Sequence, residues 1–242
     1  MTYNTKPVLY SPENGIDNLL VRQPLFVWYN LPYFGDSTTY QIMIDDNSDF
    51  SSPEISKSGI AEGYDNGKTN HTAESKIVVD KIHYWRVRAY SDGKYSEWSD
   101  TWNFTVLSSI AILLPVKEIN FGKINLTETK DTISSEITPI KIVNDGNVDL
   151  NIIVKATYIW DSIKEESEKY QFLINEDKPN SYLSALETWT NFKNETDELA
   201  ITRLYYDDEK DSAKIHVKVT VPSDEPPFEK NSTITVVAEM GE

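Results

Sequence analysis

The 242-residue chain contains no cysteine. Without thiols it has no disulfide bridges, no thiolate ligands for zinc and no thiol nucleophile. Secreted eukaryotic β-sandwiches often carry a bridge, so the absence of cysteine favours a prokaryotic or viral source.

Histidine and glycine are also scarce. The three histidines, His71, His83 and His216, have neither the spacing of a zinc site nor that of a catalytic triad. The nine glycines are scattered, so no phosphate-binding loop is present. Carboxylates are abundant, but no cleft-building pattern brings a pair of them to a substrate. We therefore expect no catalytic residues and a protein that is not an enzyme.

Basic residues are few relative to acidic ones: 23 Lys and Arg stand against 39 Asp and Glu, a net charge of −16. Such a surface repels phosphate backbones and anionic lipid, so nucleic acid is excluded as a partner. The longest apolar run, residues 110–114, is far short of the roughly 20 residues that cross a bilayer. Because no signal peptide follows Met1, we expect either a cytosolic chain or a piece without its targeting and anchor segments.

Short alternating apolar runs, separated at about ten-residue intervals by Gly, Asn, Asp, Ser and Pro, run along the chain. They predict an all-β protein of two tandem antiparallel β-sandwiches, residues 1–109 and 110–242. The segment 54–72, rich in Gly, Ser and Asn, is expected to be a loop. The strands expected in the first domain are 8–10, 25–29, 39–44, 77–79, 83–90, 95–99 and 102–106.

In the second domain the turn at 144–147 (Asn-Asp-Gly-Asn) predicts a hairpin between its flanking strands. Residues 215–221 alternate, which places Ile215, Val217 and Val219 on one face and His216 on the polar face. Loops or helical turns are expected at 161–170 and 183–194. The strands expected here are 110–114, 119–122, 140–143, 150–159, 215–221 and 234–237.

Residues 6–107 resemble the fibronectin type III family, in the version common on prokaryotic surface proteins. The matching motifs are 11–15 (Ser-Pro-Glu-Asn-Gly), 24–28 (Pro-Leu-Phe-Val-Trp), 40–44 (Tyr-Gln-Ile-Met-Ile) with 49–50 (Asp-Phe), and 84–89 (Tyr-Trp-Arg-Val-Arg-Ala). With Trp85, Val87 and Ala89 turned inward, His83 falls where the family has its corner tyrosine. That departure leaves the hydrogen bond of the corner in question.

Residues 95–99 (Tyr-Ser-Glu-Trp-Ser) are similar to the Trp-Ser-x-Trp-Ser box of cytokine-receptor modules, with Tyr95 in place of the first tryptophan. In that family the box stacks on arginines of the adjacent strand. The resemblance implies that Arg86 and Arg88 stack on Trp98 as a structural cation–π brace, and it leaves a ligand-contacting surface as the alternative.

The second domain is more loosely similar to immunoglobulin-like domains of archaeal and bacterial surface proteins. The residues concerned are 119–122 (Ile-Asn-Phe-Gly), 142–147 (Ile-Val-Asn-Asp-Gly-Asn) and 221–222 (Val-Pro). Together the two resemblances imply an extracellular or cell-surface location.

Calcium is the best cofactor candidate, although we expect no bound cofactor. Asp45, Asn47 and Asp49 alternate in an acidic turn, where oxygen ligands suit a hard cation. An EF-hand would need glycine next, but Phe50 follows as an expected core anchor, so a plain Asx turn is favoured. The run 207–211 is likewise expected to be a solvated hairpin tip.

Five Asn-x-Ser/Thr sequons permit glycosylation without establishing it. Asn103 is expected on a strand and is the poorest acceptor. The other candidates are Asn70, Asn125, Asn194 and Asn231.

Aromatic residues expected at the surface are the remaining candidate for a binding patch for glycan or protein, with core packing as the alternative. They are Tyr33, Phe34, Tyr158, Trp160, Trp189, Tyr205 and Tyr206. We expect a non-enzymatic extracellular module that spaces or presents binding surfaces at a cell surface. The alternatives are a carbohydrate-binding accessory region of a secreted hydrolase and a self-assembling surface or filament subunit that docks by edge-strand addition.

Overall fold

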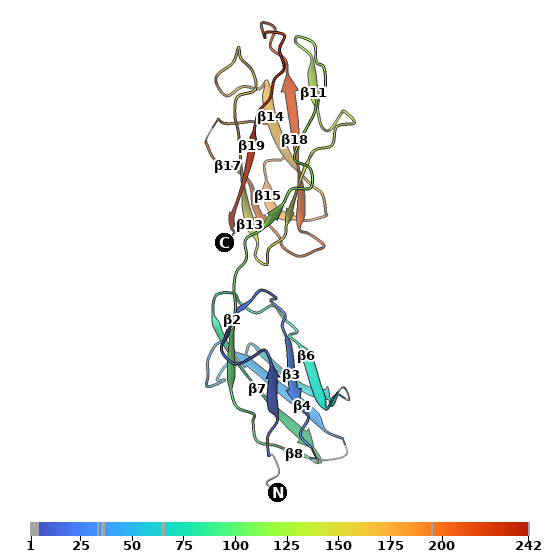
Figure 1. Ribbon diagram of the computed structural model, residues 1–242, viewed down its shortest axis with the longest axis vertical. Helices are drawn as coiled ribbons and strands as arrows, with labels where there is room; N and C mark the ends of the chain where they lie inside the picture. The colour runs from blue at the N-terminus through green and yellow to red at the C-terminus, as the bar shows by residue number, and fades with distance from the viewer. Residues whose placement is uncertain (1–4, 33, 35–36, 64–65, 195, 242) are drawn as a thin grey trace. The chain divides into compact units, whose positions relative to one another are not determined.

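The computed structural model describes residues 5–32, 34, 37–63, 66–194 and 196–241 (Figure 1). The chain forms two compact units, Met1–Ser108 and Ser109–Glu242, which we call the N-terminal and C-terminal units. Each unit contains two β-sheets, and no helix occurs among the described residues. The prediction of an all-β protein built from antiparallel sandwiches is therefore confirmed. No helix of the described residues is long and apolar enough to span a membrane.

The N-terminal unit pairs a three-stranded sheet with a larger one (Figure 1). The first sheet has the order β1-β3-β6 and the second the order β2-β9-β7-β4-β5, with β8 also paired to β7. The strands are β1 (Val8–Ser11), β2 (Ile16–Leu19), β3 (Leu25–Tyr29), β4 (Thr39–Asp45), β5 (Ile55–Ala61), β6 (Lys68–Thr72), β7 (Ile82–Ser91), β8 (Lys94–Tyr95) and β9 (Trp102–Val106).

Aromatic rings from the two sheets pack against each other in the core of this unit. Phe26 of β3 lies 4.9 Å from the Trp85 ring of β7, and Trp28 lies 5.5 Å from Tyr40 of β4. Trp85, Val87 and Ala89 are fully buried, which confirms the register predicted for β7. The predicted core anchor Phe50 is also buried.

Apart from the strand predicted at 95–99, of which only Tyr95 lies in a strand, two predictions for this unit are wrong. The segment 54–72 contains two strands, β5 and β6, and each lies at the edge of its sheet. Edge strands pair along one side only and face solvent, so they need no apolar alternation, and the polar composition of this segment concealed them. Residues 77–79 form no strand: Ile77 is buried, but its backbone N–H donates to the Arg22 carbonyl in a loop.

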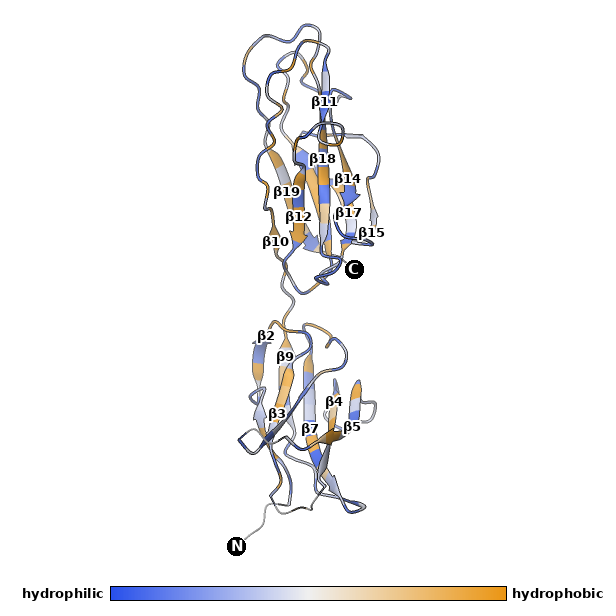
Figure 2. Cartoon of the chain, turned by 90° about the vertical axis from the view of Figure 1, so that its right-hand side faces the viewer, coloured by the Kyte–Doolittle hydropathy of each residue, from blue (hydrophilic) through white to orange (hydrophobic). Residues whose placement is uncertain are grey.

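The C-terminal unit also has two sheets. Their orders are β10-β12-β18-β14-β16, with β11 paired to β18, and β15-β17-β13-β19. The strands are β10 (Ile112–Leu113), β11 (Thr129–Asp131), β12 (Ile140–Asn144), β13 (Leu150–Ala156), β14 (Tyr170–Glu176), β15 (Tyr182–Ala185), β16 (Thr190–Asn191), β17 (Glu198–Leu204), β18 (Ser212–Thr220) and β19 (Ile234–Met240). Apolar and polar residues alternate along β18 (Figure 2).

The hairpin predicted at residues 144–147 is wrong. The strands on either side, β12 and β13, enter different sheets: β12 pairs with β10 and β18, and β13 pairs with β17 and β19. The turn residues determine only the local backbone conformation, whereas the pairing of a strand is decided by which sheet buries its apolar face. The Asn144 side chain is buried and donates to the carbonyls of Val148 and Leu204.

Three further expectations for this unit need correction. Residues 119–122 form no strand, whereas 183–194 contribute to β15 and β16. The polar face predicted for His216 is not exposed there: His216 is buried, and its Nδ1 lies 3.0 Å from the Thr132 hydroxyl. β18 is central in its sheet: β12 and β11 pair along one side of it and β14 along the other. Thr132, which follows β11, reaches the His216 ring.

Candidate functional site

Arginine and aromatic side chains form a continuous stack on the N-terminal unit, in the order Phe50, Arg86, Trp98, Arg88, Tyr95. We call these five residues the stacking ladder. The Arg86 guanidinium carbon lies 4.0 Å from the Phe50 ring centroid and 4.4 Å from that of Trp98. The Arg88 guanidinium carbon lies 4.4 Å from the Trp98 centroid and 3.6 Å from that of Tyr95. Each cation is thus held between two rings.

Two serines hold the segment that carries Trp98 against β7. The Ser96 Oγ accepts a hydrogen bond from the Ala89 N–H at 2.9 Å, and the Ser99 Oγ accepts one from the Val87 N–H at 3.0 Å. The backbone N–H groups of both serines donate to the carbonyls of the same two β7 residues. The anchors are three residues apart, whereas a strand repeats every two. For this reason residues 96–99 run beside β7 without forming the predicted strand, and only Tyr95 lies in β8.

The surroundings of the two arginines differ. The Arg88 Nε donates to the Gln41 Oε1 at 2.8 Å. Burial lowers the pKa of the Arg86 guanidinium, and the neighbouring positive charge of Arg88 lowers it further. The rings above and below hold these two like charges next to one another, which is a structural use of cation–π attraction.

We expect Trp98→Ala to lower the free energy of unfolding of the N-terminal unit by about 2 kcal/mol, because it removes two cation–π contacts and the burial of the ring. The midpoint of its thermal transition should fall by roughly 10 °C. Differential scanning calorimetry would measure the change. Trp98→Phe, which keeps a ring between the guanidinium groups, is the matched control and should lose less. An unchanged midpoint for Trp98→Ala would show that the stack does not contribute to the stability of the unit.

The carboxylates of the acidic turn after β4 accept hydrogen bonds from the backbone of the same turn. Asp45 accepts hydrogen bonds from the N–H groups of Asn47 and Ser52, at 3.2 and 3.3 Å. Asp49 accepts one from the Ser51 N–H at 3.0 Å, which lowers the pKa of its carboxyl. These are the contacts of an Asx turn. Phe50, which follows, has a φ of 57° and turns its ring onto Arg86.

The sequons lie in different settings. Asn70 is exposed on the edge strand β6, and Asn231 is exposed in the loop before β19. Asn125 is also exposed, but its amide donates to Glu128 at 2.9 Å. Asn103 lies on β9, and its backbone N–H and side-chain amide both donate to the Asn14 side chain. Asn194 is half-buried.

His83 is fully buried at the start of β7 and supplies a hydrogen bond at the corner position. Its Nε2 lies 2.9 Å from the Val78 carbonyl oxygen, five residues upstream. Since a carbonyl oxygen can only accept, Nε2 donates. The Nδ1 lies 2.9 Å from the Glu54 Oε2. The histidine therefore makes the backbone contact whose presence the sequence left in question.

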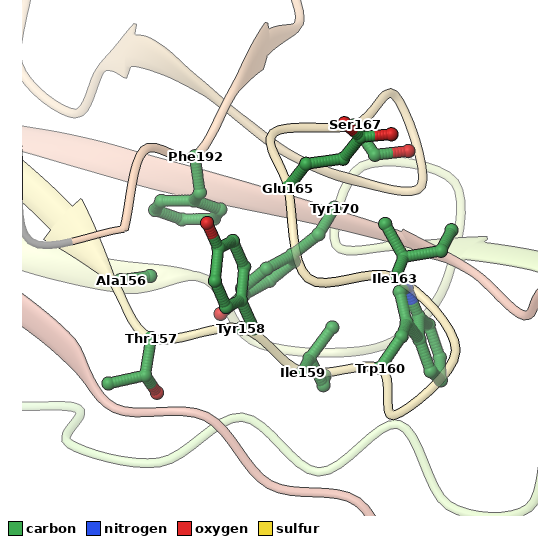
Figure 3. A pocket seen from close by; sticks show the side chains of 10 residues that line it. All are labelled: Ala156, Thr157, Tyr158, Ile159, Trp160, Ile163, Glu165, Ser167, Tyr170 and Phe192. Atoms are coloured by element: carbon green, nitrogen blue, oxygen red, sulfur yellow. The ribbon is translucent and has the colours of Figure 1, made fainter.

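A shallow hollow, partly open to solvent, lies in the C-terminal unit beside the end of β13 (Figure 3). Its lining includes Tyr158, Trp160, Tyr170 and Phe192. Two of these side chains already have hydrogen-bond partners: the Trp160 Nε1 donates to the Lys169 carbonyl at 3.2 Å, and the Tyr170 hydroxyl to Ser232 at 3.2 Å. The Tyr170 ring also packs 4.4 Å from that of Phe192, and burial raises the pKa of its hydroxyl to about 12. These contacts describe a packed boundary of the core.

The other candidate aromatic residues are dispersed. Trp189 is half-buried with the Lys218 ammonium 4.7 Å above its ring, while Tyr205 and Tyr206 are half-buried near the 207–211 turn. Phe34 packs against the core of the N-terminal unit. Tyr33 lies outside the described residues.

A buried carboxylate that the sequence did not single out closes the loop after β13. Glu225 accepts hydrogen bonds from the N–H groups of Asp161 and Ser162 and from the Ser162 hydroxyl, at 2.9, 3.1 and 2.6 Å. The Lys230 Nζ lies 2.8 Å from it and also bonds Asp161. Burial alone would raise the pKa of Glu225, but the hydrogen bonds from Lys230 and Ser162 lower it to about 2. Asp161 and Ser162 lie more than 60 residues away from Glu225 in sequence, so no local motif marked this contact.

Among the described residues, no group of three or more His, Asp and Glu side chains is arranged to hold a metal ion.

No known protein family matches the chain, and no curated protein does. Solved structures with partial similarity include an α-L-rhamnosidase from Dictyoglumus thermophilum (13% identity, TM-score 0.32) and the chicken CNTN1 FN1-FN3 domains (13%, 0.32), each aligned over 96% of this chain. A Streptomyces avermitilis α-L-rhamnosidase complexed with L-rhamnose aligns over 97% (12%, 0.27). The alignments span 27% and 23% of the two rhamnosidases and 67% of the CNTN1 chain. Similarities at these TM-scores carry no argument about function.

Proposed function

We propose that the chain is a non-enzymatic, load-bearing spacer of a prokaryotic or viral cell-surface protein, with a fibronectin type III-like unit followed by an immunoglobulin-like one. The observation that carries the proposal is the pairing of β2 with β9. These strands lie near the two ends of the N-terminal unit and are paired in parallel, Ile16 opposite Phe104 and Leu19 opposite Val106.

Parallel terminal strands resist tension in a particular way. The Gly15 N–H donates to the Asn103 carbonyl and the Leu107 N–H to the Leu19 carbonyl, both at 2.8 Å. A pull on the two ends of the unit drives β2 and β9 in opposite directions along their length. Their hydrogen bonds are then loaded together rather than opened one after another. The stacking ladder and its serine anchors stiffen the same sheet from β7 without a disulfide.

We expect Leu107→Pro to lower the force at which the N-terminal unit unfolds when the full chain is pulled by its ends. Proline removes the N–H that bonds Leu19, and the preceding Val106 is already extended, as proline requires. Single-molecule force spectroscopy would measure one step for each unit. The C-terminal unit is the internal control, and Leu107→Ala, which keeps the N–H, is the matched variant. Equal forces for wild type and Leu107→Pro would contradict the spacer proposal.

The hollow beside β13 supports one alternative, a carbohydrate-binding accessory region, because aromatic rings line it (Figure 3). Wild-type protein on a glycan array distinguishes the two functions. Binding that Tyr158→Ala abolishes would favour carbohydrate recognition, and no binding would favour the spacer.

A further inference from the structure

The strand β19 is a long, unprotected sheet edge. It pairs with β13 over seven consecutive residues, from Ile234 to Met240, without a bulge. The other edges are shorter or irregular: β10 and β16 have two residues each, β15 has four, and the pairing of β5 with β4 shifts in register. Edge strands are normally blocked by proline, lysine or a bulge. β19 (Ile-Thr-Val-Val-Ala-Glu-Met) has none of these and is rich in β-branched residues.

The backbone groups that β19 turns away from β13 can be identified. The Thr157 N–H donates to the Thr233 carbonyl and the Gly241 N–H to the Asp149 carbonyl. Hydrogen bonding in an antiparallel pair alternates, so Thr235, Val237 and Glu239 also bond β13. The outward residues are Ile234, Val236, Ala238 and Met240. No backbone hydrogen bond from any described residue reaches them.

We propose that β19 pairs antiparallel with β19 of a second copy of this chain, about a two-fold axis at Val237. In this register Ile234 lies opposite Met240 of the second copy, and Val236 lies opposite Ala238. All four outward residues of each strand then exchange their N–H and C=O groups, which joins the two four-stranded sheets into one. Registers centred on Val236 or Ala238 leave an outward residue of β19 without a partner on the other strand.

The side chains of β19 are self-complementary in the same register. Glu239, its one charged residue, lies opposite Thr235 of the second copy, so no two like charges meet. Val237, which is 41% exposed, meets its own copy at the axis. This non-hydrogen-bonded position brings the two side chains into contact. The proposal goes beyond the spacer function and does not depend on it.

A single cysteine tests the register, because the chain has no other. Across a non-hydrogen-bonded antiparallel pair the Cα atoms are about 4.5 Å apart, within the roughly 4.4–6.8 Å that a disulfide spans. We expect Val237→Cys to form a covalent dimer under mild oxidation, at least tenfold faster than the exposed control Leu183→Cys on β15. Thr235→Cys alone and Glu239→Cys alone should stay monomeric, since each is about 13 Å from its own copy. An equimolar mixture of these two should form mixed dimers.

Light-scattering mass on a dilution series gives the independent test. Wild type should shift from monomer to dimer as concentration rises. Ala238→Pro should remain monomeric, because the N–H that it removes faces away from β13 and is needed only for pairing with the second copy. The hydrogen bonds between β19 and β13 should be kept, and an unchanged thermal midpoint would establish that the variant folds. A wild type that is monomeric throughout, or Val237→Cys that oxidises no faster than Leu183→Cys, would overturn the proposal. Neither result affects the force-spectroscopy test of the spacer proposal, which measures the unfolding force of the N-terminal unit.

Discussion

Glu225→Ala should lower the free energy of unfolding of the C-terminal unit by about 3 kcal/mol, because it breaks a buried ion pair and leaves its partner charge behind. Glu225 is 6% exposed, and its carboxylate joins Lys230 to the loop at Asp161 and Ser162. The thermal midpoint of the unit should fall by roughly 10 °C, measured by calorimetry.

The same carboxylate predicts a dependence on pH. The folded-state pKa of Glu225 is about 2, below the ordinary glutamate value of 4.5. Its stabilisation is therefore complete above pH 4.5 and is lost as the pH falls from 4.5 towards 2. Asp177, whose pKa is held low by Lys141 and Lys214, titrates in the same direction. The contribution of Glu225 must therefore be measured as a difference between variants.

Glu225→Gln is the matched variant, since it keeps the shape and one acceptor oxygen and does not titrate. The gap in unfolding free energy between wild type and Glu225→Gln, measured by urea denaturation, should narrow as the pH falls from 4.5 to 2. A gap that stays constant over this range would mean that Glu225 does not carry the acid sensitivity. A stable Glu225→Ala variant would mean that Lys230 and the loop find other partners.

His83→Leu should destabilise the N-terminal unit by about 3 kcal/mol, measured by urea denaturation. The ring is fully buried between the Val78 carbonyl and Glu54, and it stacks on Phe104 at 5.7 Å. Leucine fills much of the volume but leaves the Val78 carbonyl without its donor, and an unsatisfied buried group costs about 1–3 kcal/mol.

His83→Gln separates polarity from packing, because its amide can donate to the Val78 carbonyl although it lacks the ring. We expect it to recover part of the loss. Glu54→Gln should have a smaller effect than either, since the Glu54 side chain is 30% exposed and water replaces part of its contact. If His83→Leu were as stable as wild type, apolar packing rather than the hydrogen bond to Val78 would hold this corner.

The predictability of the strands depended on their position in a sheet. In the central strands β4 and β7 apolar residues recur at every second position, so their composition indicated their existence, their limits and their inward faces. β5 and β6 carry polar side chains at sheet edges and gave no such pattern. The turn at 144–147 had hairpin chemistry, but its flanking strands pair with segments far away in sequence. Local residues do not encode that choice.

The candidate sites divide in the same way. The resemblance of residues 95–99 to the Trp-Ser-x-Trp-Ser box implied that Arg86, Arg88 and Trp98 lie together, and all three belong to adjacent segments. The sequence did not place Phe50 in the stacking ladder. It contacts Arg86 because it follows β4, which pairs with β7 in the folded unit. Glu225 and Lys230 met Asp161 and Ser162 across more than 60 residues.

By itself the sequence determined that this is an all-β protein and which faces of its central strands are buried, because apolar periodicity and turn residues act over a few neighbours. Only the tertiary structure decided the parallel pairing of β2 with β9, the burial of Glu225, and the free edge of β19. Each of these depends on which distant segments come side by side, a choice made by burial of the whole core rather than by local preference.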